Sequence, residues 1–163
     1  MVRVPSLERA IEVFRRSDGV MRTSQALQAG IHPRDLYALR DAGVLTRVSR
    51  GVYRLSELPP LREPDLATVA ARVPKAVVCL ISALHFHGLT LEIPHAVDIA
   101  LLPGSAAPRL AWPPVTVYRF SRPMFEAGIE THDRDGIRLR VYEPAKTVAD
   151  CFTHRSKIGL DVA

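Results

Sequence analysis

The fold of the first third of this chain is decided by residues 33–55, PRDLYALRDAGVLTRVSRGVYRL. Its pattern predicts a helix over 33–42, closed by Gly43, and two strands over 44–48 and 51–55. Proline fits the first position of such a helix, because the N–H group it lacks would have no intrahelical partner there. A serine, an arginine and a glycine supply the turn between the strands.

Two further helices are predicted before this stretch. Apolar residues at helical spacing from Leu7 to Phe14 indicate the first, with Ser6 as its N-cap and residues 17–19 as its end. Thr23 is the predicted N-cap of the second, which ends before Gly30. The resulting order is helix, helix, turn, helix and a two-stranded ribbon. This order is typical of a winged helix-turn-helix that binds double-stranded DNA.

The distribution of charge supports the same interpretation. Up to Leu55 the chain carries ten arginines, no lysine and five acidic residues, whereas the remainder carries twelve bases and twelve acids. The whole net charge of +5 therefore belongs to the first third. Arginine suits phosphates and guanine edges, because its planar fork donates two hydrogen bonds at once. A general preference for arginine would explain its use over lysine, but not its position.

The helix over 33–42 is the expected recognition helix. Leu36 and Leu39 suit its core side, whereas Arg34, Tyr37 and Arg40 recur every three residues and share another face. Because the second helix of the motif lies in the major groove, we expect these three side chains to contact base edges. In the alternative interpretation the arginines are solvated and the tyrosine packs against the domain.

Phosphate contacts are expected from the start of the second helix and from the ribbon. Free N–H groups and hydroxyls at a helix start hold phosphates, although plain capping is an equal alternative. A ribbon tip follows the DNA backbone or enters the minor groove. These expected contacts are Thr23, Ser24, Gln25, Arg47, Arg50 and Arg54.

Beyond Pro59-Pro60 the pattern changes to mixed α/β, which makes the chain α+β overall. We place the DNA-binding domain at 1–58 and a second domain at 59–163. Strands are expected at 96–102, 115–120, 129–132 and 137–142, and helices at 65–72, 82–87 and 145–154. The run 76–80 fits a buried strand or the start of a helix. The last residues, 158–163, resemble the opening of another element, so we expect the second domain to be incomplete here.

No catalytic or metal site is predicted in the second domain. His85 and His87 point about 200° apart on a helix and so do not share an ion readily. Asp98 interrupts an apolar strand, but a nuclease or transferase site needs clustered acids. Glu92, Asp98 and Glu143 are too scattered in the sequence to assemble one. We therefore predict a non-enzyme without cofactor or metal.

The compartment follows from what the sequence lacks. Cys79 and Cys151 are two isolated cysteines in apolar surroundings, which predicts buried free thiols rather than a disulfide framework. No apolar run reaches the about 18 residues of a membrane span. The first six residues lack the apolar core of a signal peptide. We therefore expect a cytoplasmic protein without a membrane partner.

Three segments resemble one known family. The block 39–55 resembles the winged helix-turn-helix of the AbiEi antitoxin family. The segments 82–90, SALHFHGLT, and 143–152, EPAKTVADCF, are similar to later parts of that family. These proteins belong to type IV toxin–antitoxin systems of abortive infection, a form of phage defence. The resemblance implies an N-terminal domain that represses its own operon and a C-terminal domain that opposes a nucleotidyltransferase-like toxin.

Two other functions remain open from the residues alone. One is a plain winged-helix transcription factor whose second domain senses a ligand or dimerises. The other is a DNA-directed nuclease or transferase. An adjacent gene for a nucleotidyltransferase favours the antitoxin. A clustered acid pair in the folded second domain favours the enzyme.

Overall fold

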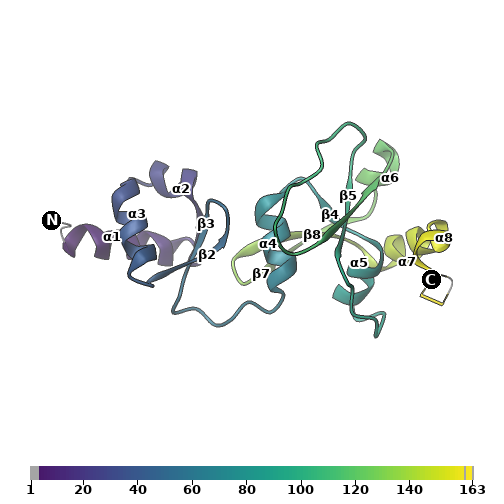
Figure 1. Cartoon of the computed structure of the whole chain (residues 1–163), viewed down its shortest axis with the longest axis horizontal. Helices are drawn as coiled ribbons and strands as arrows, with labels where there is room; N and C mark the ends of the chain where they lie inside the picture. The colour runs from purple at the N-terminus through teal and green to yellow at the C-terminus, as the bar shows by residue number, and fades with distance from the viewer. Residues whose placement is uncertain (1–3, 160, 163) are drawn as a thin grey trace. The chain divides into compact units, whose positions relative to one another are not determined.

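A computed structural model describes residues 4–159 and 161–162 of the chain (Figure 1). The chain divides into two compact units, one up to Arg72 together with Arg134–Ile137, and one of Val73–Asp133 with the residues from Arg138 on. Each unit has its own sheet and its own apolar core. The α+β class predicted from the sequence is confirmed. The domain division at residue 58 stays a prediction.

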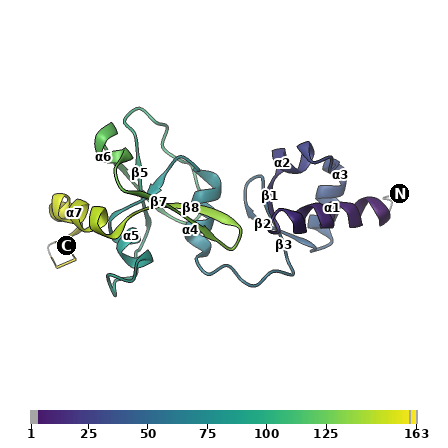
Figure 2. The same ribbon diagram turned by 180° about the vertical axis from the view of Figure 1, so that it is seen from behind.

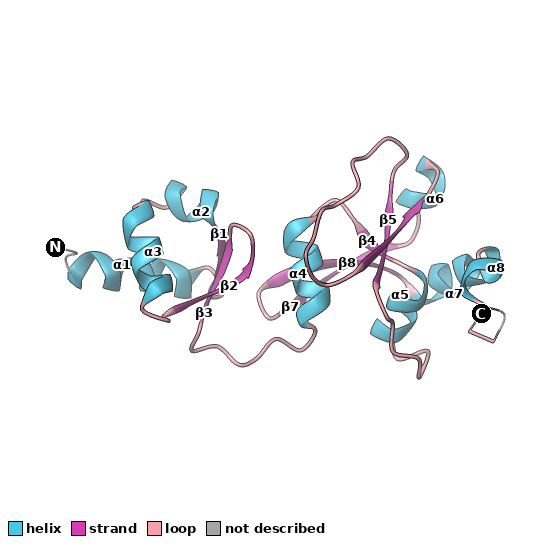
Figure 3. Cartoon of the chain, in the orientation of Figure 1, coloured by secondary structure: helices cyan, strands magenta, loops and turns pink. Residues whose placement is uncertain are grey.

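Three helices and a small sheet form the part of the first unit up to Leu55, as Figure 3 shows by colour. The helices are α1 (Val4–Arg16), α2 (Thr23–Gln28) and α3 (Pro33–Asp41). The strands, all antiparallel and in the order β1-β3-β2, are β1 (Val20–Arg22), β2 (Leu45–Ser49) and β3 (Val52–Leu55). The predicted winged helix-turn-helix order is therefore present. A fourth helix, α4 (Pro64–Arg72), follows the ribbon.

Both predicted N-caps differ in the structure. Ser6 lies inside α1 rather than before it, and its hydroxyl donates to Asp35 Oδ2 on α3. Thr23 is the first residue of α2, and Arg22 is the cap, with its backbone N–H donating to Gln25 Oε1 at 2.8 Å. In both cases a long-range partner takes the hydroxyl that local capping would otherwise use.

A mixed five-stranded sheet, in the order β6-β5-β4-β8-β7, forms the second unit. Its strands are β4 (Val77–Val78), β5 (Val97–Leu101), β6 (Val115–Arg119), β7 (Ile129–Arg134) and β8 (Ile137–Tyr142). The pairs β4–β8 and β5–β6 are parallel, whereas β4–β5 is antiparallel. The sheet is therefore mixed.

Four helices accompany this sheet. They are α5 (Leu80–Phe86), α6 (Arg122–Glu126), α7 (Pro144–Thr153) and α8 (Arg155–Ile158). The view from behind in Figure 2 again places α5 beside α7, in agreement with their packing contacts. The run 76–80 is thus both a strand and a helix start. Of the expected last element, Leu160 and Ala163 lie outside the described residues.

The two cysteines lie where the sequence placed them. Cys79 and Cys151 are buried free thiols in the core of the second unit. Burial raises the pKa of the Cys151 thiol to about 11, so the thiol stays protonated at neutral pH. In the part of the chain that the structure describes, no helix is long and apolar enough to span a bilayer.

Candidate nucleic-acid interface

The helix α3 presents one buried and one exposed face, as its sequence predicts. The His32 ring nitrogen Nδ1 accepts the Arg34 N–H at 3.1 Å, so a histidine caps the helix just before the proline. Leu36 and Leu39 are 0% and 2% exposed and anchor the helix to the core. The opposite face carries the three predicted base contacts, Arg34, Tyr37 and Arg40, and all three side chains are exposed.

On that exposed face, Arg40 and Tyr37 form a pair. The Arg40 guanidinium carbon lies 5.0 Å from the Tyr37 ring centroid, and the tyrosine is 44% exposed. An Arg40 nitrogen also contacts Asp41 Oδ1 at 2.8 Å. The hydrogen bond to Asp41, with a smaller contribution from Tyr53, raises the pKa of Arg40. Exposed ion pairs contribute only about 0–1 kcal/mol, so a phosphate or a guanine can replace Asp41 at low cost.

Arg34 is also exposed, beside a buried carboxylate that the sequence did not point to. Asp35 is 5% exposed, and its Oδ1 lies 3.9 Å from Arg34 Nε. Its other oxygen accepts the hydroxyl of Ser6 from α1. This contact ties α3 to α1. The only sign of this residue's importance in the sequence was its position in the first turn of the helix, where the helix dipole stabilises a negative charge.

The turn of the β2–β3 ribbon has Arg50 exposed at its tip and Gly51 with φ +74°. Only glycine adopts this left-handed conformation without a steric penalty. The pairing of β2 with β3 shifts register between Arg47 and Ser49, and Arg47 is exposed, with its Nε 3.4 Å from the Ser49 carbonyl oxygen. The side chains of Arg47 and Arg50 are therefore both exposed to solvent on this ribbon.

The start of α2 is joined to the same turn. The Thr23 N–H donates to the Gly51 carbonyl at 2.8 Å, and its hydroxyl lies 3.4 Å from that oxygen. Ser24 and Gln25 are exposed. Thr23 is partly buried and engaged by Gly51. The structure thus brings the predicted phosphate contacts of α2 and the ribbon tip together.

Arg54 differs from the other predicted contacts. It is 7% exposed, and its Nη2 donates to the Pro59 carbonyl at 2.7 Å. The cause is its place on β3, the central strand, whose four residues are all buried. Its register partners, Val20 and Thr46, also lie away from the turn. The guanidinium is thus directed to the chain after the ribbon rather than to the exposed surface.

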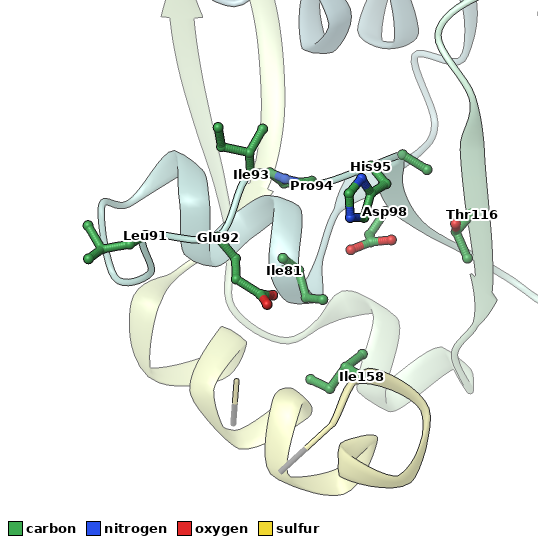
Figure 4. A pocket seen from close by; sticks show the side chains of 10 residues that line it. Ile81, Leu91, Glu92, Ile93, Pro94, His95, Asp98, Thr116 and Ile158 are labelled. Atoms are coloured by element: carbon green, nitrogen blue, oxygen red, sulfur yellow. The ribbon is translucent and has the colours of Figure 1, made fainter. Parts of the chain in front are cut away.

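In the second unit, the scattered acids of the sequence separate into two groups. Glu92 and Asp98 line one cavity of about 640 Å³, shown in Figure 4, whereas Glu143 is exposed before α7 and is not part of the lining. No group of three or more His, Cys, Asp or Glu side chains suited to a metal ion occurs among residues 4–159 and 161–162. His85 Nδ1 and His87 Nε2 bond instead to the carbonyls of Glu92 and Tyr142.

One family model matches part of the first unit. Residues 8–56 match the family model described as "Transcriptional regulator, AbiEi antitoxin". The match begins inside α1 and ends one residue beyond β3, so it includes the exposed face of α3. No curated protein matches the chain.

Proposed function

We propose, on the premise that residues 8–56 match the AbiEi antitoxin family of transcriptional regulators, that this protein is a DNA-binding antitoxin that represses its own operon. The observation that carries the proposal is the exposed face of α3, where Arg34, Tyr37 and Arg40 lie opposite the buried Leu36 and Leu39. A helix of this kind enters the major groove with its exposed residues on base edges. The domain at 1–58 is the proposed DNA-binding unit.

Arg40 is the residue we assign to direct base reading. Its guanidinium is held over the Tyr37 ring at 5.0 Å, which limits the rotamers it samples before binding. A side chain held in place loses less entropy on binding, and a bidentate arginine–guanine contact contributes about 1–3 kcal/mol of discrimination. Arg34, nearer the start of α3, is the second proposed base contact.

Phosphate contacts are assigned to the ribbon and to the start of α2. Arg47 and Arg50 are exposed and positively charged, and the turn lies beside Thr23. Ser24 and Gln25 are exposed on the same short helix. Such contacts position a protein on the duplex without reading its sequence. The proposed interface omits Arg54, because its guanidinium is buried against Pro59.

The proposed antitoxin activity belongs to the second domain, at 59–163. It opposes a nucleotidyltransferase-like toxin, either by contact or by acting on the toxin's substrate. Two observations support a separate task for this domain: its twelve basic residues are nearly balanced by eleven acidic ones, and it has its own sheet and core. We propose that it does so in the cytoplasm and without catalysis of its own.

Fluorescence anisotropy tests the DNA-binding proposal. A labelled duplex from upstream of the protein's own gene is titrated with the full chain, beside a scrambled duplex of equal composition. Specific binding by a regulator is typically 10³-fold or more tighter than non-specific binding. Equal affinity for the two duplexes contradicts repression of this operon.

Co-expression tests the antitoxin proposal. The protein encoded beside this gene is induced in cells with and without the full chain, and growth is followed. We expect growth arrest that the full chain relieves. A variant with Arg34 and Arg40 replaced by alanine separates the two activities, because relief then occurs without repression. Growth arrest that persists with the full chain contradicts the antitoxin assignment.

The structure also gives one observation in favour of a ligand-sensing second domain. The cavity beside Asp98 is of the size that small-molecule sites usually have, about 300–1,000 Å³. A DNA-binding first domain and a ligand-binding second domain are compatible, because transcriptional regulators commonly contain one of each.

A further inference from the structure

The cavity beside β5 combines apolar side chains, of which Leu91 and Ile93 are largely exposed to solvent, with one buried carboxylate. Its volume is about 640 Å³. The apolar lining comes from Ile81, Leu91, Ile93, Pro94, Ala96 and Ile158. Figure 4 shows the Asp98 carboxylate directed into the space between His95, Ile81 and Thr116. A large apolar cavity with a few converging polar groups is the usual form of a small-molecule site.

Asp98 is held in place by the start of α5. The Ser82 N–H lies 3.4 Å from Asp98 Oδ2, and the Asp98 N–H donates to Ser82 Oγ at 2.9 Å. The side chain of Ser82 in turn lies 3.3 Å from the carbonyl of Ala96. These reciprocal bonds fix the carboxylate on one side. A residue so held presents a preformed acceptor rather than a mobile one.

The charge of this carboxylate is not balanced within the described chain. Asp98 is 7% exposed, and none of the ion pairs among residues 4–159 and 161–162 includes it. Burial raises the pKa of its carboxyl to about 6, and the amides of Ser82 and Ile81 offset only part of that effect. Buried ionised carboxylates are normally paired with a cation. The cavity wall supplies no lysine or arginine, and it adds a second acid, Glu92.

We propose that this cavity binds a small organic cation, a protonated amine on an apolar body, with the ammonium group on the Asp98 carboxylate. The apolar body lies against Ile81 and Ile158, and Thr116 offers a hydroxyl beside the ammonium group. Charge-assisted hydrogen bonds to a carboxylate are about twice as strong as neutral ones, so the charge selects amines over alcohols. This assignment does not depend on DNA binding.

Binding of 2-phenylethylamine tests the proposal, with 2-phenylethanol as its neutral counterpart. Backbone amide shifts of the full chain are followed by NMR at about pH 8, where a group of pKa about 6 is ionised. The amine is added to about 20 mM, because fragment-sized ligands bind with dissociation constants near the millimolar range. We expect saturable shifts at Ile81, Ser82 and Thr116, and affinity for the alcohol at least about tenfold lower.

Two variants locate the effect. Asp98→Asn keeps the size and the acceptor oxygen but removes the charge, and it is expected to weaken amine binding at least about tenfold. Glu92→Gln removes a charge from the exposed part of the same cavity, and its effect is expected to be about threefold or less, since exposed charges are screened. If Asp98→Asn does not fold, the comparison of amine with alcohol in the unmodified chain still shows whether the cavity recognises the positive charge.

Three results overturn the proposal. The first is the lack of saturable shifts with the amine. The second is equal affinity for amine and alcohol, which shows an apolar cavity without charge recognition. The third is an Asp98→Asn variant that is folded and binds the amine as tightly as the unmodified chain does.

Discussion

The guanidinium carbon of Arg40 lies 5.0 Å from the ring centroid of Tyr37, one turn earlier on the exposed face of α3. A cation held over an aromatic ring at a surface contributes about 0.5–1 kcal/mol. The pair therefore favours a guanidinium that is ordered before it meets DNA, in a helix whose other face is anchored by Leu36 and Leu39.

Arg40→Ala is expected to reduce sequence discrimination. If Arg40 reads a base, affinity for the operator falls by about 1–3 kcal/mol, whereas affinity for the scrambled duplex changes little. Anisotropy titrations of both duplexes measure the difference. Arg16→Ala is the matched control, because it also removes one exposed arginine but lies at the end of α1. An equal loss on both duplexes would assign Arg40 to a phosphate instead.

Arg50→Ala is expected to act on all sequences alike. Arg50 is exposed at the ribbon tip, where a backbone contact carries no sequence information. We expect similar weakening on operator and scrambled DNA, and a salt slope that is smaller by about 1, because one fewer counterion is released. Titrations over a range of salt concentrations measure the slope. An unchanged slope, with Arg47→Ala as the second ribbon variant, would remove this contact from the interface.

Gly51→Ala is expected to destabilise the first unit through the backbone alone. Gly51 has φ +74°, and a Cβ there would meet Thr23 Oγ1 at 3.7 Å, an ordinary contact. The cost is therefore the left-handed conformation, about 1–2 kcal/mol for alanine. Thermal unfolding of the full chain measures it. Gly51→Asn is the control, because asparagine adopts this conformation more readily, and equal losses for the two variants would point to the side chain instead.

The first unit could be predicted from its sequence because its signals are local. A proline at the helix start, glycines at the turns and apolar residues at helical spacing each act within a few residues. Arg54 shows the limit. Its burial depends on β1 pairing on one side of β3 and on the chain near Pro59, and neither is visible in the alternation of the strand itself.

The second unit was predicted less completely because the order of strands in its sheet depends on pairing between residues far apart in the sequence. The strand β4 has two residues, and its parallel pairing of Val78 with Val141 joins segments more than 60 positions apart. The helix α6 was missed, although Ser121 precedes it and a proline lies in its first turn. Those residues do signal a helix start. The cavity joins residues from α5 to α8, so only the folded chain brings Asp98 and Ile158 together.

Asp98→Asn is expected to stabilise the chain at high pH and not at low pH. The pKa of the folded carboxyl is raised to about 6 by burial, from an ordinary value of 3.8. The folded state therefore holds the proton more tightly than the unfolded state. The stabilisation of the folded state by this bound proton is fully present below pH 3.8 and is lost as the pH rises through about 6.

The variant removes this ionisation but keeps an oxygen for the Ser82 N–H. A shift of about two pKa units corresponds to about 3 kcal/mol, so we expect a gain of about 1–3 kcal/mol near pH 8 and little change near pH 4. Urea unfolding of both chains at the two pH values measures the gain. Glu92→Gln, on the exposed part of the cavity, is expected to stay within about 0.5 kcal/mol at both. If Asp98→Asn shows the same gain at both pH values, the carboxylate is not the source, because only its ionisation differs between them.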